Sequence, residues 1–326
     1  MITFWFALVV LAWVLYFVLE GFDFGVGILA PVLGRDDHER GAAIRTVGPF
    51  WDGNEVWLVA AIGVTFAAFP AWYAALLSGL YLPFALVLLL LAVRGVALEF
   101  RGKHASPRWR RRCETALAAS SAGVMLLWGA ILAVFARGLA LDGAGAVTGT
   151  GLGRSLGPLW TVWSLAGAVL ALGGAVLLGA TFLALRTTGP VRRRARRASM
   201  LAGLTLAVAT FTAGWALDSR PFLVAAMVTV GVTVLARSGR ESTAFVGTAV
   251  GAAAAVATIL TGHGDVLLPS TLDPAWSLTR DSAAATASTL RLLTIAGVII
   301  LPGVLAYQAY SYWIFRRRVS SERIPS

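Results

Sequence analysis

Long apolar stretches separated by short polar or basic connections run through almost the whole sequence. A helix needs roughly 20 mostly apolar residues to cross a bilayer, and backbone groups in lipid must bond internally, which favours helices. The pattern therefore predicts about nine membrane-spanning helices. They cover Phe4–Leu33, Gly48–Phe69, Ala71–Phe100, Thr115–Ala136, Pro158–Leu185, Ala198–Leu217, Pro221–Ala236, Ser242–Thr261 and Ala287–Phe315.

Arginines alternate between the connections. They gather in the first, third, fifth and seventh connections and in the tail, as at Arg110–Arg112 and Arg316–Arg318, and they are few in the others. Because Lys and Arg stay on the cytoplasmic side, the N-terminus is expected outside the cytoplasm and the C-terminus inside. The apolar N-terminus lacks a preceding basic stretch and a cleavage site, which predicts a retained first helix rather than a signal peptide.

Composition supports the membrane assignment. The chain is 58% hydrophobic and 13% charged, with a mean hydropathy of +0.78, whereas soluble chains are about a quarter charged. The excess of 27 Lys+Arg over 16 Asp+Glu is explained by the connections, so no nucleic-acid partner is expected. The single cysteine, Cys113, excludes an internal disulfide and a CxxC-type metal site.

The expected fold class is thus an all-α integral membrane protein, with about nine helices arranged as two bundles plus a peripheral helix. Residues 1–138 would form an N-terminal four-helix bundle, and 139–157 a Gly-rich linker outside the cytoplasm. Residues 158–316 would form the C-terminal helices, and 317–326 a cytoplasmic tail. The long loop 262–288 is expected to be either an ordered outer cap or a mobile loop.

Charged side chains within the apolar stretches are the candidate functional residues, because each is costly in lipid. Glu20 and Asp23 lie three residues apart and share one helix face. Gly21 and Gly25 beside them would allow another helix to approach closely. No phosphate-binding or hydrolase motif accompanies them.

The second and third stretches carry the remaining charges, Asp52, Glu55, Arg94 and Glu99. The predicted topology places all six charged residues in the cytoplasmic half of one bundle, where they are expected to converge. Clustered acids that open to one side of a membrane suit proton uptake or cation passage.

Other interpretations remain open for several of these residues. Asp52 could cap its helix, although Gly48 and Pro49 resemble the helix start. Trp51 and Trp57, which flank Asn54, could belong to an interfacial aromatic belt. Arg94 could extend to the interface while Glu99 is solvated.

Candidate metal or haem ligands are scarce. His38 and His104 lie in basic connections, and His263 lies at the outer end of a span. Haem iron takes an axial His, Met, Cys or Tyr, and isolated methionines such as Met125 are typical of core packing. The sequence therefore predicts that this chain holds no metal and no haem.

Two segments, Glu20–Gly27 (EGFDFGVG) and Trp51–Leu58 (WDGNEVWL), resemble the N-terminal signatures of cytochrome bd oxidase subunit II. Arg94–Lys103 is similar to a third signature, Leu268–Thr279 to an outer-loop motif, and Tyr310–Phe315 to the family's closing segment. The resemblance runs nearly end to end and is weakest across Leu139–Thr261.

The resemblance implies a haem-free subunit of a bacterial plasma-membrane terminal oxidase, which oxidises quinol and reduces dioxygen to water. It places two b-type haems and one d-type haem in a partner, subunit I. Small accessory subunits and a bound lipid or quinone stay open. Similarity to actinobacterial members suggests menaquinol as the donor.

The same resemblance assigns proton transfer to Asp52, Asp23 and Glu99, with Arg94 as charge partner. Some members carry Asp at the Glu99 position, which changes the reach of the carboxylate. A proton- or cation-coupled secondary transporter is the alternative, but broken helices and internal symmetry are not evident. A purely structural scaffold would leave the clustered acids unexplained.

Overall fold

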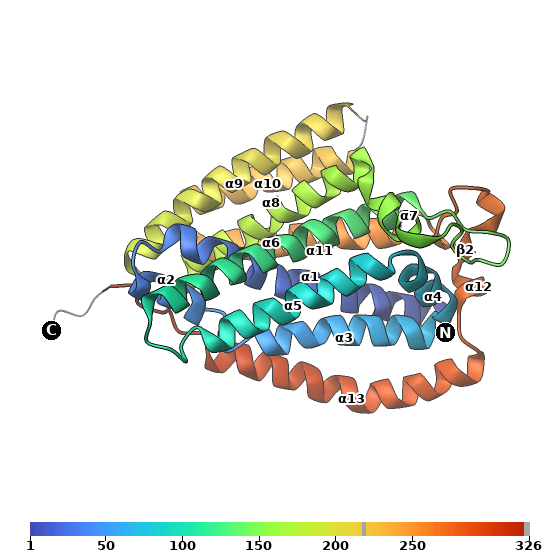
Figure 1. The fold of residues 1–326 in the computed structure, drawn as a ribbon, viewed down its shortest axis with the longest axis horizontal. Coiled ribbons are helices and arrows are strands. Elements are labelled where there is room, and N and C mark those ends of the chain that lie inside the picture. Colours follow the sequence, from blue (N-terminus) through green and yellow to red (C-terminus); the bar gives the residue numbers. More distant parts are fainter. Residues whose placement is uncertain (217–219, 323–326) are drawn as a thin grey trace.

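The computed structural model describes residues 1–216 and 220–322. It is a bundle of long, roughly parallel and antiparallel helices (Figure 1). The N-terminal helices are α1 (Ile2–Leu33), α2 (Asp37–Arg45), α3 (Trp51–Ala68), α4 (Pro70–Gly79), α5 (Tyr81–Phe100) and α6 (Pro107–Arg137). The remaining helices are α7 (Gly151–Leu156), α8 (Val162–Arg186), α9 (Gly189–Ala216), α10 (Arg220–Arg237), α11 (Glu241–Thr261), α12 (Arg280–Ala283) and α13 (Ala287–Ile314).

Seven of the described helices are long and apolar enough to cross a membrane, namely α1, α5, α6, α8, α9, α11 and α13. The other two expected spans correspond to α3, whose polar start lowers its mean hydropathy, and to α10, whose apolar part covers Phe222–Arg237. The all-α membrane fold is confirmed. The expected end of the sixth span at Leu217 lies outside the described residues.

Two expected boundaries were wrong. The predicted span Ala71–Phe100 is two helices, because Leu80 leaves the helical conformation (φ −118°, ψ 31°) between α4 and α5. Pro83 then lies in the first turn of α5, where a helix needs no backbone N–H from it. The predicted start at Gly48 is also incorrect, because residues 46–50 form turns and α3 begins at Trp51.

Helix α1 lies inside the bundle and packs against α3, α6, α8 and α11. A Cβ on Gly25 would overlap the carbonyl oxygen of Ala175, and a Cβ on Gly179 would overlap the backbone of Gly25. The expected close approach of another helix is therefore confirmed, with α8 as the partner. Gly129 and Gly167 join α6 to α8 in the same way.

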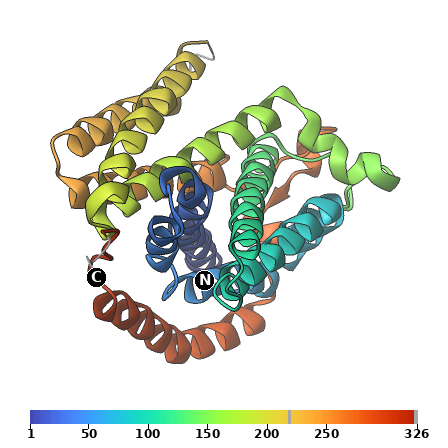
Figure 2. The ribbon, with the colours of Figure 1, turned by 60° about the vertical axis from the view of Figure 1, so that its left-hand side comes forward.

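Helix α13 is the peripheral helix and lies apart along one side of the bundle (Figures 1 and 2). Only 6% of its apolar 18-residue stretch is buried inside the chain. Near its start, the Trp5 indole donates to the Leu290 carbonyl (3.2 Å) and the Thr294 hydroxyl (3.1 Å). Beyond its end, Val319 pairs with Thr187 in the turn between α8 and α9.

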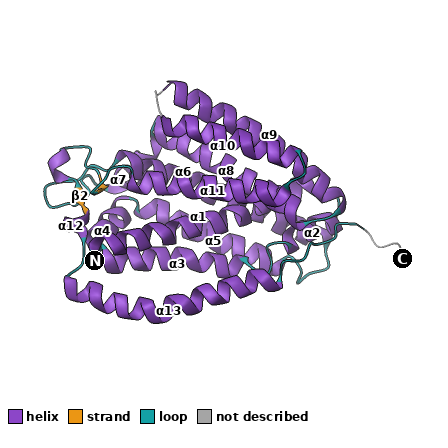
Figure 3. Ribbon diagram, turned by 180° about the vertical axis from the view of Figure 1, so that it is seen from behind, coloured by secondary structure: helices purple, strands orange, loops and turns teal. Residues whose placement is uncertain are grey.

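Of the two alternatives for the loop 262–288, an ordered cap or a mobile loop, the structure shows the ordered cap. It contains β1 (Val266–Leu268), which pairs antiparallel with β2 (Leu278–Thr279), and a 3-10 turn at Pro274–Trp276. The Gly-rich linker packs onto it, because Leu139 donates to Pro269 (3.0 Å) and accepts from Thr271 (2.9 Å). Together they cap the end of the bundle opposite α2 and the C-terminus (Figure 3).

Candidate functional site

A buried arginine lies at the centre of the candidate site. Arg94 is on the α5 face that packs inward, and its side chain is 0% exposed. Its Nη1 lies 3.0 Å from Glu20 Oε2 and 3.7 Å from Glu55 Oε2, and its Nη2 lies 4.0 Å from Asp23 Oδ2. The Phe24 ring lies 4.7 Å from the guanidinium carbon. The interpretation in which Arg94 extends to the interface is therefore wrong.

Helix geometry explains why the two acids of α1 meet this arginine together. Glu20 and Asp23 are three residues apart, so they project from one face. Both are essentially buried, at 0% and 1% exposure. That face is fixed because Gly25, one half-turn further on, holds α1 against the α8 backbone.

Asn54 connects the acids to the peripheral helix. Its Nδ2 donates to Asp23 Oδ2 at 2.7 Å, and its Oδ1 accepts from Gln308 (3.0 Å) and from the Tyr312 hydroxyl (2.9 Å). Sequence reasoning singled out Asn54 but missed Gln308 and Tyr312, which lie 254 and 258 positions away. Because Gln308 and Tyr312 are four residues apart, they lie on one face of their helix, and this spacing of two polar side chains could have indicated a shared partner.

The cluster has one partly exposed member. The Glu55 side chain is 27% exposed, whereas those of Glu20, Asp23 and Arg94 are sealed from the surface of the chain. Glu55 lies near the start of α3, at the end of the bundle that carries α2. Glu55 is therefore the member of the cluster that solvent at that end can reach.

Asp52 and Glu99 do not join the cluster, so the expected convergence of all six groups was wrong. Both side chains are exposed. Asp52 is in the first turn of α3 but makes no capping hydrogen bond, because the N-cap position is Phe50. Glu99 is five positions after Arg94, which turns it to another face of α5. Trp57, one of the two proposed belt residues, is buried in the core instead (6% exposed).

Above Glu20 on α1, one turn toward the N-terminus, lies Tyr16. Its hydroxyl accepts a 2.8 Å hydrogen bond from the Trp128 indole, and both side chains are fully buried. Trp13 and Phe17 stack on each other and make edge-to-face contacts with Trp128. Met125 is buried in the same apolar core (5% exposed), as expected for a packing residue.

A second polar layer, missed from the sequence, ties the basic connections together at the α2 end. Glu114 is 1% exposed and pairs with Arg40 (2.7 Å) and Arg101 (2.7 Å). Arg101 and Arg110 also hold Asp37 of α2. These ion pairs bring the first and third connections side by side.

Glu39 links α2 to α9 through Arg194 (2.7 Å). Burial alone would raise the pKa of the Glu39 carboxyl, but hydrogen bonds from Arg194 and from the Arg35 backbone outweigh it and lower that pKa below its ordinary value. Glu39 is thus a carboxylate held by the fifth connection.

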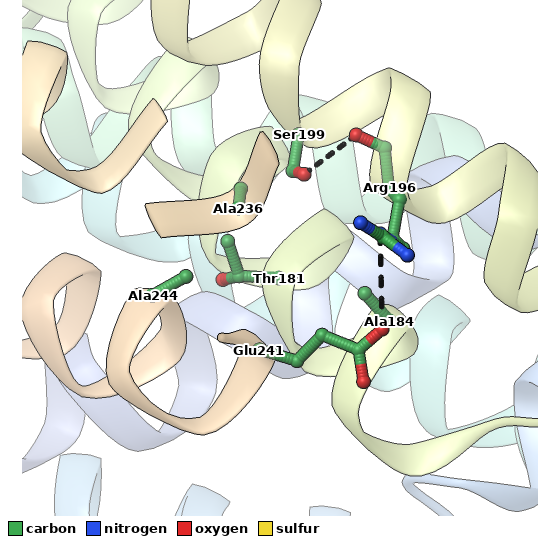
Figure 4. Close-up of a pocket in the computed structure, with 7 residues that line it drawn as sticks. All are labelled: Thr181, Ala184, Arg196, Ser199, Ala236, Glu241 and Ala244. Carbon is green, nitrogen blue, oxygen red and sulfur yellow. Dashed lines mark hydrogen bonds and ion pairs between the residues drawn. The ribbon is translucent and has the colours of Figure 1, made fainter. Parts of the chain in front are cut away.

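Glu241 is a third buried acid that the sequence did not reveal (Figure 4). It begins α11 and pairs with Arg192 (2.8 Å), with Arg318 of the tail (3.0 Å) and, at 3.9 Å, with Arg196. Ser199 and Thr181 lie beside it. It therefore joins the seventh connection, α9 and the tail at one point.

Histidine and cysteine offer little to a metal. His38, His104 and His263 are all exposed, and Cys113 is a buried free thiol. Within residues 1–216 and 220–322, no group of three or more His, Cys, Asp or Glu is arranged to hold a metal ion.

The fold and the site define a class: a multi-pass helical membrane protein with a buried arginine surrounded by acids. Residues 1–315 match the family model described as cytochrome bd terminal oxidase subunit II. The chain is 35% identical to cytochrome bd ubiquinol oxidase subunit 2 of Bacillus subtilis, over 97% of this chain and 96% of that protein. It is 30% identical to cytochrome bd-I ubiquinol oxidase subunit 2 of Escherichia coli K12, over 98% and 95%.

The chain therefore belongs to the cytochrome bd terminal oxidase subunit II family, as the sequence motifs indicated. Its fold is similar to a solved bd oxidase from Geobacillus thermodenitrificans, with a TM-score of 0.64, 18% identity and coverage of 96% and 98%. It is a subunit of a quinol:oxygen oxidoreductase complex that uses haems and quinol and includes a subunit I. The transporter alternative is set aside.

Proposed function

We propose that this chain supports the haem-bearing subunit I and supplies part of a proton-uptake route from the cytoplasm, through the acids around Arg94. The observation that carries the proposal is that three carboxyl groups lie within 4.0 Å of one guanidinium, two of them essentially sealed from the surface.

Charge balance supports a proton-carrying role. One guanidinium neutralises one of the three carboxylates, and an unpaired buried charge costs several kcal/mol. Protons bound within the cluster relieve that cost. Among the described residues no hydrogen bond reaches Glu20 Oε1 or Asp23 Oδ1, so these oxygens are available to accept a proton.

The arrangement suggests an order for the groups. Asp52 is exposed on the first turn of α3, and Glu55 lies three positions later on the same face. A proton would pass from Asp52 to Glu55 and then to Asp23 and Glu20 beside Arg94. Glu99, exposed near the same end of α5, is proposed to collect protons at the surface.

We also propose that the haems belong to the partner. The three histidines of this chain are exposed and outside its spans, and Met125 is buried in the apolar core. These residues do not fit an axial haem site. We further propose menaquinol as the donor to the complex, a proposal that rests on the sequence resemblance alone.

The proposed orientation puts the α2 end of the bundle in the cytoplasm, because that end carries the basic connections. A reporter enzyme fused after Ser326 that works only in the cytoplasm is expected to be active. Activity only with the outer-side reporter would reverse the proposed direction of proton uptake.

Asp52→Asn tests the entrance of the route. The amide keeps size and polarity but carries no exchangeable acid proton, so turnover per assembled haem is expected to fall by roughly 10²-fold with haem content unchanged. Thr115→Val serves as a control, since Thr115 is exposed and outside the cluster. Wild-type turnover per haem with intact proton uptake would remove Asp52 from the route.

A further inference from the structure

A groove runs between α5 and α6 on the outside of the chain, near the α2 end. Its volume is about 370 Å³, within the roughly 300–1,000 Å³ of small-molecule sites. Ala92, Val93, Val96 and Ala97 of α5 form one wall, and Cys113 and Ala116 lie on the α6 side. The two helices lie side by side in Figure 1. The groove is thus an apolar slot on the outer surface of this chain.

One end of this groove is polar and aromatic. Trp109 and Arg112, both in the first turns of α6, complete its lining. The Trp109 indole donates to the Phe100 carbonyl at 2.8 Å, which fixes the ring across the end of α5. Tryptophan at such a position is typical of the headgroup level of a bilayer.

Arg112 is not held by an acidic partner within the described part of the chain, in contrast to Arg101 and Arg110. Arg101 and Arg110 are occupied by Asp37 and Glu114, whereas the exposed Arg112 makes no ion pair or hydrogen bond with any described residue. It is an uncompensated cation at the mouth of an apolar slot. Arg108 and Arg111, also exposed, add positive charge nearby.

We propose that this groove binds one anionic phospholipid, with an acyl chain along Val93, Val96 and Ala97 and its phosphate on Arg112. The apolar lining matches an acyl chain, and the unpaired guanidinium matches a phosphate, which arginine binds in a bidentate manner. Basic side chains beside a span commonly recognise anionic headgroups. The site is independent of the proton route, because Arg94 faces the interior from the same helix.

The test uses the intact two-subunit complex. After delipidation it is titrated with phosphatidylglycerol or with phosphatidylcholine of identical acyl chains, and bound lipid is counted by native mass spectrometry. One phosphatidylglycerol is expected to be retained preferentially, and its occupancy should fall at least about tenfold in Arg112→Gln, a loss on the order of 1.4 kcal/mol. Arg111→Gln, an exposed neighbour that does not line the groove, should keep it.

Cys113 reports where the lipid lies, because its side chain lines the groove. Phosphatidylglycerol should slow its modification by N-ethylmaleimide, measured on the isolated peptide, and phosphatidylcholine should not. Val96→Trp, which fills the slot from an exposed position, should also displace the lipid. Equal binding of the two lipids, retention in Arg112→Gln, or a Cys113 reaction rate that does not depend on lipid would overturn the proposal. The last outcome would mean that a protein surface covers the groove.

Discussion

Arg94 on α5 and Glu20 on α1 form an ion pair with 3.0 Å between Nη1 and Oε2, and neither side chain is exposed. The desolvation cost of such a pair is high, so it is a weak source of net stability. Removing one partner, however, leaves an uncompensated charge in the interior. The stability of the packing between α1 and α5 therefore depends on both charges being present.

Arg94→Gln is expected to destabilise the chain by about 3–5 kcal/mol, the typical cost of breaking a buried pair. The yield of haem-loaded complex should fall, and its thermal unfolding temperature should drop. Arg111→Gln, at an exposed position, should leave both unchanged. Normal yield and stability in Arg94→Gln would show that the acids are already neutral without the arginine.

Asn54→Leu removes three hydrogen bonds at once, one to Asp23 and two from α13. Each buried polar group left without a partner costs about 1–3 kcal/mol. Hydrogen exchange should accelerate in the second half of α13, whereas the first half stays anchored by Trp5. Tyr310→Phe is the matched control, since Tyr310 is 57% exposed. Unchanged exchange around Gln308 and Tyr312 would contradict the described packing of α13.

Gly25→Ala tests the contact between α1 and α8. The added Cβ would overlap the Ala175 carbonyl, so the helices must separate, and assembly is expected to fail or to lose more than about 2 kcal/mol of stability. Gly63→Ala should be tolerated, because a Cβ at this position would have no atom of another helix within 4 Å. Equal yields of the two variants would exclude the close helix approach.

Glu39 makes the stability of the α2 end depend on pH. Burial would raise the pKa of Glu39, but hydrogen bonds from Arg194 and from the Arg35 backbone outweigh burial and lower the pKa in the folded protein. The ionised Glu39 therefore stabilises the folded state at pH values above the unfolded pKa of 4.5. The contribution is lost as pH falls through the lowered folded pKa. Glu39→Gln should therefore reduce the drop in unfolding temperature of the complex between neutral and acid pH. A drop identical to that of the wild type would exclude this linkage.

The sequence predicted most of the fold because span length, hydropathy and arginine placement are strong local signals. It failed at Leu80, where no charge marks the break between α4 and α5. It also failed at the start of α3, where Gly48 and Pro49 resemble a helix start but belong to a turn. Helical spacing correctly paired Glu20 with Asp23, and glycine content correctly predicted a close neighbour. Neither signal identifies the partner helix. The packing of α1 on α8 and the hydrogen bonds between Asn54 and α13 therefore could not be predicted from the sequence.

Topology placed six charged residues at one end of the bundle but could not give their rotation about each helix axis. Arg94 turned inward, whereas Glu99 and Asp52 turned outward. The buried acids Glu114 and Glu241 were overlooked because they lie in basic segments that resemble solvated connections. Their burial depends on tertiary contacts between distant connections.

The central claim is that protons for oxygen reduction pass through the carboxyl groups around Arg94. The most direct measurement is the rate of proton uptake from the α2 side, during a single turnover, by the complex reconstituted in vesicles. Glu55→Gln, at the partly exposed member, is expected to slow that uptake at least about tenfold while the haem spectrum stays normal. Uptake at the wild-type rate in Glu55→Gln and in Glu20→Gln, with normal haem content, would contradict the account and leave the cluster a structural feature.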